Sequence, residues 1–121
     1  MISINIPQPD EWLNSNHRNH WAIDARRKKA WRTAARYAAH NTTRHERVHI
    51  ECWIHKKTRR TYDAHNLTPT AKAVIDGLVD AGLIPDDTNQ HLIGPDMRQG
   101  ETRPKQPGIT LTITPQEASH A

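Results

Sequence analysis

The sequence predicts a small α+β domain in which two helices pack on a mixed β-sheet. Segments with alternating apolar and polar residues occur near both ends and in the middle of the chain, and two segments of helical character lie between them. The expected order is strand, helix, strand, helix, strand, strand. This order fits a compact α+β fold, and 121 residues are enough for one domain.

The chain begins with a predicted half-buried strand. Ile2, Ile4 and Ile6 alternate with polar residues, and Pro7 ends the pattern. Residues 10–19 have no periodic pattern, so we expect a loop there. Trp12 and Trp21 flank most of this loop, and the sequence leaves two roles open for the segment: an anchor against the core, or a contact with phosphates and bases.

A helix is predicted from Trp21 to about His40. The segment contains seven alanines and no glycine or proline, which favours a helix. The expected buried stripe is Ile23, Ala30, Ala34 and Tyr37, with Trp31 beside it. Six basic residues are almost unopposed by acids: Arg26, Arg27, Lys28, Lys29, Arg32 and Arg36. They form either a solvated face or a contact with a nucleic-acid arm.

The second strand is predicted at residues 48–55, where apolar and polar residues alternate with a period of two. Cys52 shares the apolar face with Ile50 and Ile54, so we expect it to be buried. His49 and His55 would point to the opposite face. This geometry disfavours a zinc site formed by Cys52 with the two histidines, and the chain has no second cysteine.

The second helix is predicted to begin with Thr68 as its N-cap and Pro69 at its first position. An apolar stripe follows, and Gly82 is expected as the C-terminal cap. The stripe comprises Ala71, Val74, Ile75 and Leu78. Lys72 and Asp76 are four residues apart, which permits an intrahelical ion pair.

The last third of the chain predicts two short strands. His91 to Ile93 is expected to form the first, broken by Gly94-Pro95, and Met97 to Lys105 a hairpin loop. The second strand alternates Ile109, Leu111 and Ile113 with threonines. The folded domain is therefore expected at residues 1–114, and residues 115–121 are expected to form a disordered tail.

Composition limits the classes of function. The formal charge is +4 and the isoelectric point about 9.6, which favours nucleic acid or another anionic partner. The single cysteine excludes an internal disulfide, and a cytoplasmic location is the simplest expectation. We expect no signal peptide and no membrane-spanning segment. Large aliphatic residues are few, so a dimer would help to complete the core.

Acidic residues and a histidine follow a basic run in the centre of the chain. Lys56, Lys57, Arg59 and Arg60 lead into Asp63 and His65, and Asp86 and Asp87 follow the second helix. Two carboxylates about 4 Å apart repel by roughly 4 kcal/mol at an effective dielectric near 20. A divalent cation would offset that repulsion, and Mg²⁺ and Mn²⁺ prefer oxygen ligands. Spacing alone favours the simpler interpretation, in which Asp63 is a turn residue and Asp86-Asp87 form a solvated turn after Pro85.

The same stretch resembles the RusA family of Holliday junction resolvases. The resemblance rests on Asp63-Ala64-His65-Asn66, Lys72, Asp76-Gly77-Leu78, Ala81-Gly82 and Asp86-Asp87, which match the family motif in order. It extends to a signature before the first helix and to the final strand. The resemblance implies a RusA-like homodimer that cuts four-way DNA junctions by paired nicks, using Mg²⁺ or Mn²⁺, in the cytoplasm of a bacterial or phage-infected cell.

The resemblance also implies roles for individual residues. Asp63, Asp87 and Lys72 would be catalytic. The metal would be held by four residues: Asp63, His65, Asp86 and Asp87. Seven residues would contact nucleic acid: Asn16, Arg18, Lys56, Lys57, Arg59, Arg60 and Asn66.

The sequence departs from the family at His65, where many members have a second metal-binding Asp. Leu67-Thr68-Pro69-Thr70 also lengthens the segment before Lys72. Three interpretations remain: His65 ligates the metal and favours Mn²⁺, His65 lies near the site without ligating it, or the site is weakened. The last would give a non-catalytic protein that binds branched DNA. A small RNA-binding protein would explain the charge but not the order of the acids.

Overall fold

The computed structural model describes residues 1–116 and confirms the predicted class, a small α+β fold with a four-stranded mixed sheet and two helices. The expected element order is also confirmed, with one short 3₁₀ helix added before the second helix. The elements are β1 (Ile2–Pro7), α1 (Trp21–Ala38), β2 (Val48–His55), η1 (Ala64–Leu67), α2 (Thr68–Asp80), β3 (Leu92–Gln99) and β4 (Gly108–Pro115).

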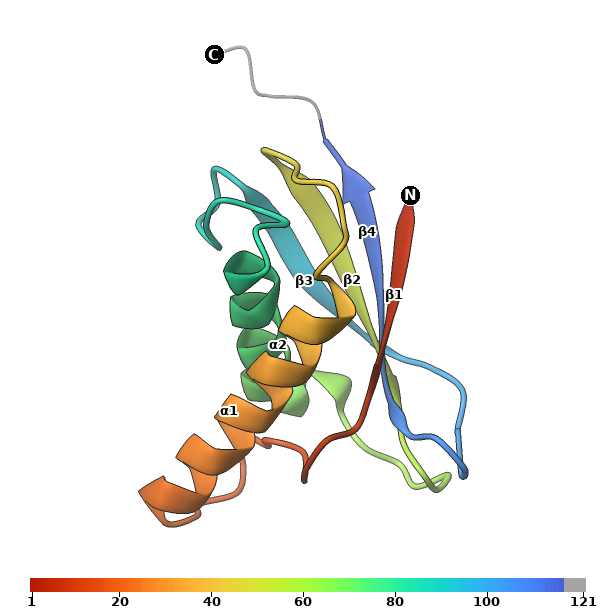
Figure 1. Ribbon diagram of the computed structural model, residues 1–121. Helices are drawn as coiled ribbons and strands as arrows, with labels where there is room; N and C mark the ends of the chain where they lie inside the picture. The colour runs from red at the N-terminus through yellow and green to blue at the C-terminus, as the bar shows by residue number, and fades with distance from the viewer. Residues whose placement is uncertain (117–121) are drawn as a thin grey trace.

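The strands lie in the order β1-β4-β2-β3. β4 is antiparallel to both of its neighbours, β1 and β2, whereas β2 and β3 are parallel. A parallel pair needs a crossover connection, and α2 lies in that connection between β2 and β3. Both helices cover the same face of the sheet (Figure 1).

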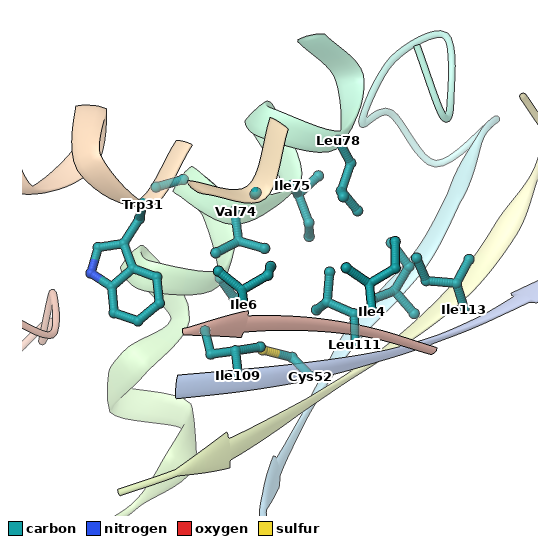
Figure 2. Close-up of a cluster of buried hydrophobic side chains, with 14 of the residues drawn as sticks. Ile4, Ile6, Trp31, Cys52, Val74, Ile75, Leu78, Ile109, Leu111 and Ile113 are labelled. Carbon is teal, nitrogen blue, oxygen red and sulfur yellow. The ribbon is translucent and has the colours of Figure 1, made fainter. Parts of the chain in front are cut away.

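The core lies between this face of the sheet and the helices. The apolar positions of β1, β2 and β4 point inward, as the alternating sequence predicted, and they meet the apolar side of α2 (Figure 2). Cys52 is fully buried among them, which confirms its expected face. The largest side chain in the core is Trp31, whose indole N–H donates to the Glu11 carbonyl at 3.0 Å.

α1 buries a different stripe from the one expected. Tyr37 is 78% exposed and Trp21 is 76% exposed, while Trp31 and Ala35 are fully buried. The stripe is rotated because Trp31 itself faces the core and packs against Trp12, with ring centroids 4.9 Å apart. A large aromatic buried at one position decides the rotation of an alanine-rich helix, because alanines bury little area on any face.

The predicted break and hairpin in the last third are wrong. β3 continues through Gly94-Pro95, which lie opposite Ile50 as a bulge between the pairs His49–Ile93 and Glu51–Asp96. A proline is tolerated there because β3 is an edge strand. Residues 100–107 do not form a hairpin loop, because β2 lies between β3 and β4.

α2 begins one residue earlier than expected. Leu67 is the N-cap residue and Thr68 the first helical residue, because η1 leads directly into α2 and its turn replaces a side-chain cap. The Thr68 hydroxyl donates instead to the His65 carbonyl at 2.6 Å. Gly82, with φ of +81°, ends α2 as expected, and the Leu83 N–H bonds the Leu78 carbonyl.

The two helices touch closely at Gly77. A Cβ at this position would lie 2.7 Å from the Ala35 Cβ and 2.9 Å from the Arg36 nitrogen. Arg32 of α1 also binds Asp80 of α2, with nitrogen–oxygen distances of 2.5 and 2.8 Å. These contacts fix α1 and α2 side by side and running in the same direction, so both helices begin at the same end of the molecule (Figure 1).

The end of the chain differs slightly from expectation. β4 continues to Pro115, so this residue belongs to the sheet and not to a tail. The Gln116 N–H donates to the Arg47 carbonyl at 2.8 Å, and the rest of the expected tail, residues 117–121, lies outside the described residues. No helix within residues 1–116 is long and apolar enough to cross a membrane.

Candidate nucleic-acid interface

The predicted site residues come from the loop before α1, the segment between β2 and η1, η1 itself, α2 and the segment after α2. The loop before α1, the segment between β2 and α2, and the start of α2 lie at the end of the molecule where both helices begin (Figure 1). The segment after α2 carries Asp86 and Asp87, and it returns far enough for Asp87 to reach Lys72. The fold therefore brings a residue that follows α2 in the sequence to a residue within α2.

Lys72 is the centre of the best-connected polar cluster. Its ammonium group binds the Asp87 carboxylate and donates to Asp76 at 3.0 Å. Asp86 supports Asp87, because its carboxylate accepts the Asp87 backbone N–H at 2.8 Å. The cluster lies at the surface: the side chain of Lys72 is 59% exposed, and that of Asp87 is 27% exposed.

The hydrogen bond between Lys72 and Asp87 favours the charged form of both groups. The hydrogen bond to Asp87, followed by the one to Asp76, raises the pKa of Lys72 above its ordinary value. The same hydrogen bond from Lys72 lowers the pKa of Asp87. At neutral pH, Lys72 is therefore protonated and Asp87 ionised. The cluster therefore presents Lys72 as a cation for a phosphate, and it holds the Asp87 carboxylate in place beside that cation.

Asp63 and His65 form a second, separate pair. The Asp63 carboxylate accepts the His65 backbone N–H at 2.9 Å and lies 3.2 Å from the ring Nδ1. Asp63 thereby caps η1, which is a structural role for this residue in the local chain. Both side chains are mostly exposed, at 62% and 76%, so they remain accessible to a partner.

Asn66 lies beside the loop that precedes α1. The Ser15 backbone N–H donates to the Asn66 carbonyl at 2.8 Å, and Asn14 bonds the Asn16 backbone N–H. Thr70 anchors the same loop, because its hydroxyl bonds both the N–H and the carbonyl of Leu13 at 2.8 Å. The structure thus brings Asn16 and Asn66 into neighbouring segments.

The basic segment after β2 lies beside the end of β3. Arg59 and Arg60 line a cavity of about 460 Å³ together with residues 99–102. Lys56 lies over the ring of Tyr62, 4.5 Å from the centroid, and Lys57 is exposed. Arg18 is exposed in the loop before α1. These cations surround the end of the molecule without forming one compact pocket.

A groove between the two helices was not predicted from the sequence, and Lys72 is the only one of its lining residues among the predicted site residues. The groove has a volume of about 550 Å³, and its walls come from both helices: Ala25, Lys28, Lys29, Arg32, Pro69, Lys72, Ala73 and Asp76. The groove places basic residues of α1 beside Lys72. Spacing of three and four residues relates Ala25, Lys28, Lys29 and Arg32, but only the pairing of the two helices shows that these residues face Lys72.

The four predicted metal ligands suit Mg²⁺ or Mn²⁺ in their chemistry but not in their arrangement. Within residues 1–116, no group of three or more His, Cys, Asp and Glu side chains is placed to hold a metal ion. Asp63 is paired with His65, while Asp87 is paired with Lys72. We therefore assign no chemical step to a metal.

Comparison of the chain with known proteins identifies no family, so the assignment of a function rests on the site residues. No family model matches the sequence, and no curated protein matches it significantly.

Proposed function

We propose that the protein is an endodeoxyribonuclease that binds four-way DNA junctions and cuts them by paired nicks, as a homodimer with Mg²⁺ or Mn²⁺. One observation carries this proposal: Lys72, held by Asp76 and Asp87, lies on the wall of a groove rimmed by Lys28, Lys29 and Arg32. Cations beside a carboxylate that an ion pair holds in place suit an anionic phosphodiester substrate better than they suit a neutral substrate.

Lys72 has two roles in this proposal. Its ammonium group would bind a phosphate oxygen and stabilise the negative charge that develops on the phosphoryl oxygens during cleavage. A phosphate that takes hydrogen bonds from Lys72 also competes with Asp87 for the same donors. Binding of DNA would therefore loosen the bond between Lys72 and Asp87 and make the Asp87 carboxylate available.

The amide and basic side chains at the same end of the molecule would bind the sugar–phosphate backbone. Asn16 and Arg18 come from the loop before α1, and Asn66 comes from η1 beside it. Lys56, Lys57, Arg59 and Arg60 precede η1. Contacts of this kind position a nucleic acid without reading its sequence, and their strength falls as the salt concentration rises. They suit recognition of the shape of a branch.

A cleavage assay on a labelled synthetic four-way junction tests the proposal. The protein is incubated with the junction and Mg²⁺ or Mn²⁺, next to the variants Asp87→Asn and Lys72→Met. Asp96→Asn is the matched control, because the Asp96 carboxylate is also within hydrogen-bond distance of a partner side chain, 2.6 Å from the His49 Nε2, but lies on the edge strand β3. We expect paired nicks from the unchanged protein and the control, and none from the other two variants.

A second candidate is supported by the absence of a three-ligand metal cluster within residues 1–116. In this alternative, the protein binds branched DNA and does not cut it. The assay separates the two functions directly. Tight binding to the junction, with no cleavage in either metal, would refute the nuclease and support the binding protein. Equal affinity for a linear duplex and the junction would refute both.

A further inference from the structure

We infer that the groove between α1 and α2 is a binding site for unpaired DNA nucleotides, with Trp21 as a stacking platform at its entrance. This inference rests on the proposed action on branched DNA, in which the base pairs next to the branch open more readily than those within a continuous duplex. It adds a binding site, a substrate conformation and a stacking residue, Trp21, to the proposed function, and it assigns phosphate contacts to Lys28 and Lys29.

The first observation is the exposure of Trp21. Its side chain is 76% exposed, although the other tryptophan that flanks the loop, Trp12, packs against Trp31. An indole in water costs free energy unless a partner covers it. The ring of His20 lies beside Trp21, with centroids 5.5 Å apart, and leaves most of the indole surface uncovered.

The second observation is the position of Trp21 relative to the groove. Trp21 lies one helical turn before Ala25, and Ala25 begins the groove wall. Lys28, Lys29 and Arg32 continue along the same side of α1 at helical spacing. Trp21 is therefore at the entrance of the groove, near the end of the molecule where both helices begin (Figure 1).

The third observation is the chemistry of the groove. Ala25, Pro69 and Ala73 contribute apolar surface, and lysines lie along the rim. Arg32 and Lys72 are engaged with carboxylates of α2 and the segment after it. Lys28 and Lys29 are exposed, and no carboxylate within residues 1–116 forms an ion pair with either of them.

These three features match one class of ligand. A nucleotide has a flat apolar base and an anionic phosphate, and a volume of about 550 Å³ is within the range of roughly 300–1,000 Å³ that is usual for small-ligand sites. Single-stranded DNA is bound in this way by other proteins, with bases on aromatic rings and phosphates on cations. The bases of an intact duplex are stacked on one another and cannot use the indole.

Binding of labelled short oligo(dT) tests the inference. Trp21→Ala should weaken binding by about 5-fold to 100-fold, because stacking of one base contributes that much to affinity, while Trp21→Phe should retain most of it. Tyr37→Ala is the matched control, since Tyr37 is equally exposed on α1 but lies on another side near the far end. Fluorescence of Trp21 should be quenched on binding.

The lysines have a separate readout. The double variant Lys28→Gln with Lys29→Gln should lower the slope of log affinity against log salt by about 1.4, because each phosphate contact with a single strand contributes about 0.7. The exposed Lys105 lies in the β3–β4 connection, and Lys105→Gln should leave the slope unchanged.

Some outcomes would overturn the inference without affecting the proposed function. Unchanged oligo(dT) affinity in Trp21→Ala, in a protein that still cuts junctions, would do so. Tighter binding to oligo(U) than to oligo(dT) would overturn the assignment to DNA. Conversely, the protein could bind oligo(dT) in a manner that depends on Trp21 but neither bind nor cut four-way junctions. That result would support the groove as a nucleotide-binding site and refute the proposed function.

Discussion

Thr70 offers the sharpest test of how the loop before α1 is held against α2. This residue is fully buried in the first turn of α2, and its hydroxyl serves both backbone groups of Leu13 at 2.8 Å. Thr70→Val keeps the shape of the side chain and removes both hydrogen bonds. Leu13 is also buried, with an exposed fraction of 4%, so its N–H and carbonyl cannot form hydrogen bonds with water instead.

The expected cost follows from these two groups. A buried backbone group without a partner costs about 1–3 kcal/mol, so the two groups of Leu13 give about 2–6 kcal/mol of lost unfolding free energy in Thr70→Val. Thr70→Ser keeps the hydroxyl and removes one methyl group, which costs only about 1 kcal/mol. The loop before α1 should also become more susceptible to proteolysis in the valine variant.

Urea unfolding followed by circular dichroism measures both variants against the unchanged protein. The valine variant should have a lower transition midpoint at an unchanged slope, and the serine variant should lie between it and the parent. A loss below about 1 kcal/mol in Thr70→Val would refute the reasoning, because it would mean that the backbone groups of Leu13 find other partners.

Three further predictions concern the helix contact, the thiol and the ion pair. Gly77→Ala should destabilise the fold by about 1–3 kcal/mol in urea unfolding, since its Cβ would meet Ala35 and the α1 backbone; unchanged stability would mean that the helices separate freely. Burial raises the pKa of Cys52 to about 12, so a thiol reagent at neutral pH should label it only after denaturation; rapid labelling of the folded protein would contradict this. Lys72 lowers the pKa of Asp87, so the stability difference between the parent and Asp87→Asn, about 0.2–1 kcal/mol, should be present above the ordinary carboxyl pKa of 3.8 and disappear as the pH falls through the lower folded value. Because the pKa of Lys72 is raised, its contribution to stability should be present below pH 10.5 and be lost as the pH rises through the higher folded value. The stability difference between the parent and Asp87→Asn should therefore be constant from pH 3.8 to 10.5, and a difference that changes near neutrality would contradict the assignment.

The sequence alone determined the elements that repeat a local pattern. Alternating residues in β1, β2 and β4 fixed which side chains point inward, because successive side chains of a strand face opposite ways. That pattern placed Cys52 in the core and separated it from His49 and His55. Helical composition likewise located both helices, and Gly82 marked the end of α2.

Features that depend on distant residues were decided by the tertiary structure. The sequence cannot show that β2 lies between β3 and β4, so the predicted hairpin was wrong. The rotation of α1 follows from Trp31 packing on Trp12, which exposes Tyr37 and Trp21.

The candidate site follows the same division. Its residue types were visible in the motif from Asp63 to Asp87, and the spacing of Lys72 and Asp76 permitted the ion pair that they form. Only the return of the chain after α2 brought Asp87 to Lys72 instead of to Asp63, and only the pairing of the two helices placed Lys28 and Lys29 beside that cluster. Periodicity reports which side a residue faces, whereas contacts between segments depend on how the whole chain closes around its core.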